Sequence, residues 1–213
     1  VERGDARGAA RLSTHATRST DGDAADALVA LRAGGRLSGA DARARAAALR
    51  SGARRYARTP GAYAKIILAL RASKVGNPRC AGRLDLLAGM NSKGRGGRYS
   101  GNVYDQSLAM LAARVLRAGP SQASVRVLMK ARGSGGWNLR MTRDSGSDSV
   151  SSTATAIIAL RGAGVSAGNG TLRSAYRWML ARRTASGGFT EEGGRAQANA
   201  TALAIRASLA MGY

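Results

Sequence analysis

The sequence predicts an all-α protein built of helical hairpins in tandem, and three observations favour this fold class. The 213 residues are 44% hydrophobic but only 4% aromatic, so the core must consist mainly of Ala, Leu, Val, Ile and Met. Small aliphatic side chains suit closely packed helices, whereas a β-sandwich would need more β-branched and aromatic residues in alternation. Apolar segments of helical length also recur along the chain, and Gly-Gly pairs with a nearby aromatic residue separate several of them.

The apolar segments share one pattern, in which small and aliphatic residues lead to an Arg and then a Gly. They are residues 25–35, 64–76, 107–119, 153–164 and 201–212. Their aligned arginines are Arg32, Arg71, Arg114, Arg161 and Arg206, with successive separations of 39, 43, 47 and 45 residues. This period accommodates two helices and two connections in each repeat.

More polar segments lie between the apolar ones, over residues 39–55, 82–91, 121–132 and 171–183. In the last of these, Leu172, Tyr176 and Met179 or Leu180 share one face, and arginines occupy the others. Helices that are apolar all round are typically buried. The alternation predicts an α/α toroid of about five to six hairpins, with apolar inner helices and amphipathic, Arg-rich outer helices. We expect residues 1–20 to form an irregular or degenerate first repeat and residues 21–213 a single repeat domain.

The connections from outer to inner helices carry a second signature, a Gly-Gly pair with an aromatic residue close behind it. It occurs at residues 96–99, 135–137 and 187–189. Paired glycines permit positive φ just after a helix ends, and the aromatic residue is expected to cover the hydrophobic layer below the loop.

At these motifs the sequence resembles the prenyltransferase/squalene-oxidase repeat superfamily, and most nearly its uncharacterised exported actinobacterial members. The superfamily includes terpene cyclases, protein prenyltransferase β-subunits and transcobalamin-like binders. The resemblance covers most of residues 25–213 and rests on the three turns and on inner helices such as STATAIIALRGAG at 152–164. It implies a toroid fold and an exported or cell-surface location, but a shared fold does not imply a reaction.

The positions that match the family's catalytic residues have lost their carboxylates. Similar cyclases use an Asp-x-Asp-Asp-Thr-Ala stretch as general acid, and the matching stretch here, 149–154, has Ser at all three acidic positions. The pKa of a hydroxyl is far too high for this task. Asp144 and Asp148 lie nearby in a Gly/Ser-rich loop, where we expect them to be solvated. Ser134 and Ser186 replace the Asp that usually precedes Gly-Gly, so we expect the loop-to-helix ties to be weakened or remade.

No cofactor, metal site or catalytic residue is predicted. The zinc of protein prenyltransferases is held by Asp, Cys and His, and this chain has one Cys and one His, Cys80 and His15, far apart in the sequence. A lone cysteine also allows no internal disulfide. We expect Cys80 at the start of an outer helix and His15 in the irregular N-terminal segment.

The starts of the inner helices of a toroid point toward one end, so we expect residues near them to converge at its mouth. The predicted ligand-binding residues, mostly aromatic or hydrogen-bonding, are Tyr63, Asn102, Tyr104, Asp105, Trp137, Ser151, Thr153, Phe189, Gln197 and Asn199. This set suits a small amphipathic or hydrophobic ligand in a concave pocket. Structural roles stay open: Trp137 and Phe189 as covers of the core, and Ser151 and Asn199 as helix caps.

The formal net charge is +22, and all but four of the basic residues are Arg. Such a charge attracts acidic polymers, including nucleic acid. Alternatively, the arginines coat the outer helices without a function, as the coding bias of a GC-rich genome would produce. No apolar run reaches the length of about 18 residues expected of a transmembrane helix, and a chain that begins at Val1 is typical of a processed or trimmed protein.

The sequence therefore favours a non-catalytic toroid module that binds a ligand or partner at its central cavity. One alternative is a cyclase-like or prenyltransferase-like enzyme with diverged catalytic residues, although one Phe, two Trp and six Tyr offer few rings to stabilise carbocations. The other is a polyanion binder that acts through its basic surface.

Overall fold

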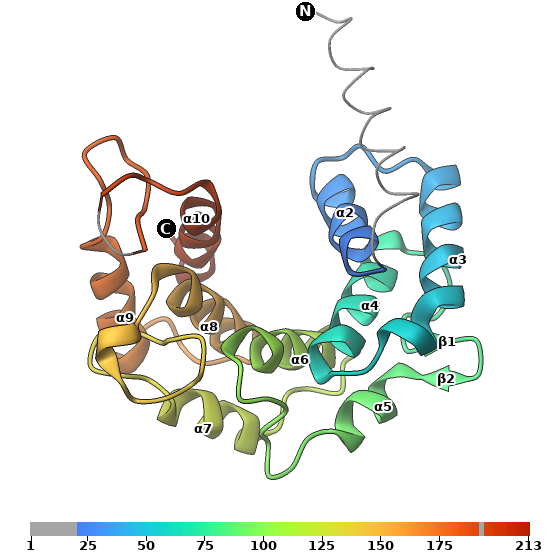
Figure 1. Ribbon diagram of the computed structural model, residues 1–213, viewed down its shortest axis with the longest axis horizontal. Coiled ribbons are helices and arrows are strands. Elements are labelled where there is room, and N and C mark those ends of the chain that lie inside the picture. The colour runs from blue at the N-terminus through green and yellow to red at the C-terminus, as the bar shows by residue number, and fades with distance from the viewer. Residues whose placement is uncertain (1–20, 192–193) are drawn as a thin grey trace, which may run out of the picture. The chain divides into compact units, whose positions relative to one another are not determined.

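A computed structural model of the protein describes residues 21–191 and 194–213, and the predicted first repeat at 1–20 lies outside them. The described residues form nine helices and one small two-stranded sheet (Figure 1), which confirms the all-α class. They divide into two compact units, one ending at Met90 and the other beginning at Asn91. The five predicted inner segments are all helical, and each helix begins three or four residues earlier than its predicted segment.

The first unit is built on three mutually contacting helices: α2 (Asp21–Ala33), α3 (Gly39–Tyr56) and α4 (Pro60–Ser73). The polar residues that precede α3 and α4 cap them: Ser38 Oγ accepts a hydrogen bond from Asp41 N–H, and Thr59 Oγ1 accepts one from Ala62 N–H. Each of the three helices contributes fully buried aliphatic side chains to the core of this unit, among them Leu28, Leu49, Ile66 and Ile67.

The helix predicted over residues 82–91 is wrong for its first half. Strand β1 (Cys80–Ala81) pairs antiparallel with β2 (Leu84–Asp85), and only then does α5 (Leu86–Ser92) begin. Arg79 Nε donates to Asp85 Oδ2 at 3.0 Å across this hairpin, and Asp85 Oδ1 accepts from Ala88 N–H at 2.9 Å. Asp85 therefore both closes the hairpin and caps α5, which delays the helix. Cys80 lies in a strand and not at a helix start.

The second unit contains the remaining five helices, with a short 3₁₀ turn at Ser145–Ser147. They are α6 (Val103–Val115), α7 (Gln122–Lys130), α8 (Val150–Gly162), α9 (Gly170–Leu180) and α10 (Ala198–Met211). The predicted inner helices contact one another in succession, because α8 packs against both α6 and α10, and α7 and α9 also contact α8. Within this unit, the helices predicted as inner therefore contact one another, and α7 and α9 pack against α8.

Burial follows the predicted alternation only in part, with exceptions at α2, where Val29 is 39% exposed, and at α10. Ten of the thirteen residues of α8 are buried, whereas α9 buries one stripe that contains Leu172, Tyr176 and Met179. Helix α10 differs from the prediction that inner helices are buried all round, because Ile205 and Leu209 are 53% and 67% exposed. Ile205 and Leu209 therefore lie on a face of α10 that no other described element covers.

The Gly-Gly turns use their glycines for two different steric purposes. Gly97 and Gly187 adopt positive φ, 85° and 88°, as predicted. Gly135 and Gly136 do not, and the prediction is wrong for this turn. A Cβ at Gly135 would lie 2.0 Å from Trp178 Nε1, and one at Gly136 would lie 2.0 Å from Thr153 Oγ1. This turn therefore needs glycine because a helix and a ring approach its backbone closely.

One hydrogen bond recurs at all three turns, from the backbone N–H of the aromatic residue to the next inner helix. The pairs are Tyr99 with Gln106 Oε1 (2.8 Å), Trp137 with Thr153 Oγ1 (3.0 Å) and Phe189 with Thr201 Oγ1 (2.9 Å). Each acceptor is the fourth residue of its helix, α6, α8 or α10. The three turns and helices are therefore structurally equivalent repeats.

The shared arginine is the twelfth residue of α2, α4, α6 and α8. Arg32 Nε in α2 donates to Ala72 O of α4 at 2.7 Å, and Arg161 Nε in α8 donates to Ala210 O of α10 at 2.7 Å. These guanidinium groups bind free carbonyls at the end of the next inner helix, where cations are also favoured by the helix dipole. In α10 the twelfth residue is Leu209, so the alignment on Arg206 was one turn out of register.

Candidate functional site

The loops that lead into α8 and α10 enclose a cavity of about 990 Å³ in the second unit, which we call the loop cavity. Its lining comes from the end of the loop before α8, the segment after α9 and the turn before α10. The lining residues are 146–149, 181–185, Thr190, Glu191 and Gly194. Nearly all of these are polar or small, so the cavity favours a ligand that forms hydrogen bonds over a purely hydrophobic one.

Unpartnered oxygen atoms gather at the loop cavity. Asp148 Oδ1 and Thr190 Oγ1, from two lining residues, are buried and have no hydrogen-bond partner within the described part of the chain. Ser151 Oγ, at the start of α8, is also buried without a hydrogen-bond partner among the described residues. Thr190 and Ser151 are only 7% and 4% exposed. A buried polar atom without a partner costs about 1–3 kcal/mol, and native structures keep few of them.

Asp148 has a structural role that the sequence did not predict. Its Oδ2 accepts hydrogen bonds from the N–H groups of Gly135 (3.2 Å) and Gly136 (2.8 Å). The expectation that Asp148 is solvated was therefore wrong: Asp148 ties this Gly-Gly turn, which Ser134 precedes, to the loop before α8. Asp144 is exposed and caps the 3₁₀ turn through Gly146 N–H (3.1 Å) and Ser147 Oγ (2.9 Å).

Glu191, in the turn before α10, binds the start of α8. Both of its carboxylate oxygens accept from Ser151 N–H, at 3.2 and 3.3 Å. A carboxylate at this position also interacts favourably with the helix dipole. Burial raises the pKa of the half-buried Tyr104 phenol, and the negative charge of Glu191 adds to this rise, against the opposing effect of the neighbouring Ser151 side chain.

The two arginines of the cavity are held by neighbouring groups. The Arg182 guanidinium lies 3.5 Å from the centroid of the Trp178 ring and donates to Trp178 O at 3.2 Å. Arg183 Nε donates to Gly187 O at 3.3 Å. No ion pair joins either arginine to Asp148 or Glu191 in the part of the chain that the structure describes. Both signs of charge therefore line the cavity without neutralising each other directly.

Several predicted ligand-binding residues support the fold instead. Trp137 is fully buried, and its ring N–H donates to Leu128 O at 2.7 Å. Phe189 lies in the same hydrophobic core, as the alternative role allowed. Thr153 accepts the Trp137 N–H, and Asn102 caps α6 by accepting from Tyr104 and Asp105 N–H.

The predicted caps of α8 and α10 need correction. Ser149, and not Ser151, caps α8, because Ser149 Oγ accepts from Ser152 N–H. Gln197 occupies the cap position of α10 without a side-chain hydrogen bond, and Asn199 lies exposed within the first turn. The Ser151 side chain is instead buried beside the Tyr104 phenol.

The predicted set is brought together only in part. Tyr104 and Ser151 lie beside Glu191, whereas Tyr63 belongs to the first unit, where its ring packs so close to Gly89 that a Cβ there would lie 2.5 Å from it. Sequence reasoning did not find Thr190, Glu191, Arg182 or Arg183. For Thr190 and Glu191 one signal was present, since they follow directly on the Gly-Gly-Phe turn that had been recognised.

Comparison with known proteins yields no match to a family model, to a curated protein or to a solved structure. Within the described ranges, no three His, Cys, Asp or Glu residues are placed to hold a metal ion. None of the described helices has the length and apolar character needed to span a membrane.

Proposed function

We propose that this chain is a non-catalytic helical-repeat module of the α/α-toroid type that binds a ligand or partner through the loop cavity. The repeat architecture is supported by the succession of α6, α8 and α10 and by the turn hydrogen bond that recurs at the fourth residue of each. The relation to the prenyltransferase/squalene-oxidase repeat superfamily, and the export that this resemblance implies, are parts of the same proposal.

The observation that carries the binding proposal is the set of unpartnered buried oxygens of Asp148 and Thr190, which line the cavity, and of Ser151, whose N–H is bound by the lining residue Glu191. A ligand with hydroxyl, amide or ammonium donors would satisfy them and remove their desolvation cost. Two of them belong to hydroxyl groups, which can also donate. A small amphipathic ligand with several polar groups therefore fits the cavity better than a hydrocarbon.

The non-catalytic part of the proposal rests on what the carboxylates near α8 do. Asp148 Oδ2 and both oxygens of Glu191 accept backbone N–H groups and so hold the turn and the helix start. Ser149 Oγ, at the first acidic position of the cyclase-like stretch, caps α8. Among the described residues at this end, both carboxylates thus bind backbone N–H groups, whereas a cyclase uses a carboxylic acid that donates its proton to the substrate.

Thermal-shift and calorimetric titrations with monosaccharides, dipeptide amides and prenyl alcohols test the proposal. We expect at least one of these ligands to stabilise the protein, and T190V and S151A to weaken that ligand at least tenfold. S107A is the matched control, because Ser107 Oγ is also buried and unpartnered but belongs to α6 and not to the cavity. Equal binding by all three variants would contradict this location.

The enzyme alternative makes a different prediction for the same preparation. Incubation with farnesyl diphosphate or squalene should leave the substrate unchanged if the module is non-catalytic. Turnover that D148N or E191Q abolishes, while S107A retains it, would replace the proposed function with a cyclase-like or prenyltransferase-like one.

A further inference from the structure

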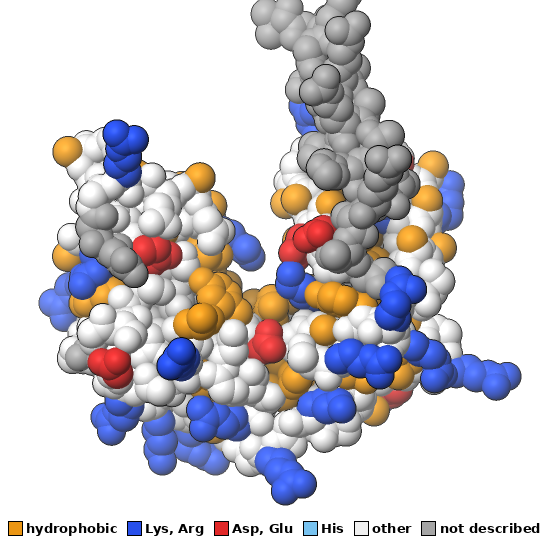
Figure 2. Space-filling view, in the orientation of Figure 1, with side chains coloured by type: hydrophobic (Ala, Val, Ile, Leu, Met, Phe, Trp, Pro, Cys, Tyr) orange, Lys and Arg blue, Asp and Glu red, His pale blue; other side chains and the backbone are white. Residues whose placement is uncertain are grey.

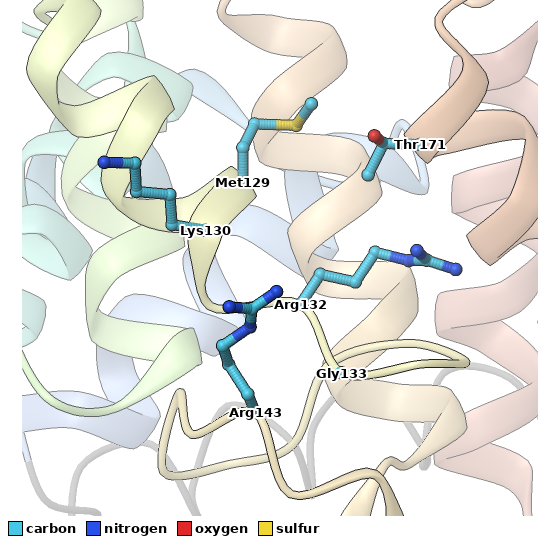
Figure 3. A pocket seen from close by; sticks show the side chains of 6 residues that line it. All are labelled: Met129, Lys130, Arg132, Gly133, Arg143 and Thr171. Carbon is cyan, nitrogen blue, oxygen red and sulfur yellow. The ribbon is translucent and has the colours of Figure 1, made fainter.

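A second pocket, of about 590 Å³, lies between the end of α7 and the start of α9 and is separate in lining from the loop cavity. Figure 3 shows the six residues that form it: Met129, Lys130, Arg132, Gly133, Arg143 and Thr171. Three of the six are cationic and none is acidic. We call this the α7–α9 pocket.

Arg132 is fixed in place, and its Nε donor is left without a partner. Its Nη2 donates to Ser134 O (3.0 Å), Gly135 O (3.1 Å) and Ser174 Oγ (3.0 Å), which holds the guanidinium between the Gly-Gly turn and α9. Its Nε is buried and has no partner. An unpaired donor on a buried cationic group is costly, and an anion in the pocket is the kind of ligand that would remove this cost.

The other two cations are not neutralised by the protein. Lys130 and Arg143 are exposed, and neither forms a hydrogen bond or an ion pair within the described residues. In Figure 3 the Arg143 guanidinium reaches from its loop toward the end of α7, beside the stem of Arg132, whereas the Lys130 ammonium lies farther out at the rim. Figure 2 shows further Lys and Arg side chains over the region of α7 and α9.

Two carboxylates lie near this pocket in the sequence or in space, and both are engaged elsewhere. Asp148 lies against Gly133, where a Cβ would be 2.8 Å from either of its oxygens, but it does not line the pocket, and its Oδ2 binds the Gly-Gly turn. Asp144 follows Arg143 directly and binds the 3₁₀ turn. Neither pairs with Arg132 or Arg143.

We infer that the α7–α9 pocket binds the phosphate group of a small phosphate monoester. A phosphate dianion has several acceptor oxygens and matches donors that different elements contribute to the lining: Arg132, the Arg143 guanidinium and Thr171 in the first turn of α9. The positive charges of Arg132 and Arg143 balance the charge of one dianion, and Lys130 adds a further positive charge at the rim. The pocket volume falls within the range of small-molecule sites, about 300–1,000 Å³, so the organic part of the ester fits as well.

Calorimetric titration with inorganic phosphate and with phenyl phosphate at constant ionic strength tests this inference. We expect saturable binding of both, tighter for phenyl phosphate, and a loss of at least tenfold in affinity in the double variant K130A/R143A. The matched control is R126A/R177A, which removes two exposed arginines from α7 and α9 that do not line the pocket. It should retain affinity within about twofold, the scale of a long-range effect screened by salt.

Two results would overturn the inference. One is an equal loss of affinity in both double variants, because it would mean that phosphate responds only to total charge. The other is saturable binding of a DNA duplex without binding of phenyl phosphate, because the basic surface would then serve nucleic acid. Lys130 and Arg143 have no structural partners, so K130A/R143A is expected to melt at the wild-type temperature, which circular dichroism checks.

Discussion

The hydrogen bond from Trp137 N–H to Thr153 Oγ1 offers a direct test of the turn geometry that defines the repeats. Both residues are fully buried, and the bond measures 3.0 Å. The substitution T153V keeps the shape of the side chain but replaces the acceptor oxygen with a methyl group. The buried Trp137 N–H then has no partner, which costs about 1–3 kcal/mol.

Packing adds to this loss. The Thr153 oxygen lies so close to Gly136 that a Cβ there would be 2.0 Å from it, so a larger methyl group in its place meets the turn backbone. We therefore expect T153V to lower the free energy of unfolding by about 2–3 kcal/mol. For a chain of this size that corresponds to a fall in melting temperature of about 4–12 °C.

Urea denaturation followed by tryptophan fluorescence measures the unfolding of the second unit, which contains Thr153. Both tryptophans of the chain, Trp137 and Trp178, lie in the second unit. T153S keeps the acceptor and should cost less than T153V. T155V is the matched control, because Thr155 Oγ1 only donates to Ser151 O within α8, and it should stay within about 0.5 kcal/mol of wild type.

The reasoning would be refuted if T153V unfolded at the wild-type urea concentration. It would also be refuted if T153S were as unstable as T153V, since the lost methyl packing and not the acceptor would then be responsible.

Three further predictions concern the ties between helices and the turns. R161Q should lower the free energy of unfolding of the second unit by about 1–2 kcal/mol, since it removes a hydrogen bond to a helix end; R114Q, at the same helix position but exposed, should change it by less than 0.5 kcal/mol. G135A should destabilise by more than about 2 kcal/mol and shift tryptophan emission, because the added Cβ collides with an indole ring. The hydrogen bond from Arg79, and then a backbone N–H, hold the pKa of Asp85 below its ordinary value. Its contribution to stability is therefore complete at neutral pH and is lost as pH falls through that lowered pKa, so acid titrations of thermal stability should be flatter for D85N than for wild type.

The sequence predicted the helices from a periodic signal, and this succeeded where burial decides the structure. In α8 nearly every side chain is buried, so its small and aliphatic composition identified both the helix and its place in the core. The segment 82–91 was misassigned because two polar contacts decide it. The bond between Arg79 and Asp85 and the cap from Asp85 to Ala88 are specific pairings that no periodicity reveals.

The site was predicted in part for a similar reason. Comparison between the repeats located the turns, and the resemblance to the superfamily drew attention to Ser134 before Gly135, but neither could show that Asp148 binds this turn from another loop. Glu191 was missed because its partner, the Ser151 N–H, is 40 residues away. Ser151 was predicted as a site residue because helix starts were expected to converge on one end of the fold. The residue that caps α8, however, is Ser149.

Asp148 links the fold to the proposed binding site through its two different oxygen atoms. Oδ2 accepts the N–H groups of the Gly-Gly turn, whereas Oδ1 is buried at the cavity without a partner. An asparagine can place its carbonyl oxygen toward the turn, and its NH₂ group then occupies the position of Oδ1. D148N should therefore melt within about 3 °C of wild type, the effect of less than about 1 kcal/mol in a chain of this size, yet lose a donor-bearing ligand at least tenfold, because a donor now faces a donor.

D148A removes both oxygens and should therefore lower both the melting temperature, through the loss of the turn hydrogen bonds, and the affinity for the ligand. The pair of variants thus separates the two roles of one side chain, with melting temperature reporting on Oδ2 and ligand affinity on Oδ1. If D148N bound the ligand as wild type does, Oδ1 would not be a contact atom, and the binding role would rest on Thr190 and Ser151 alone.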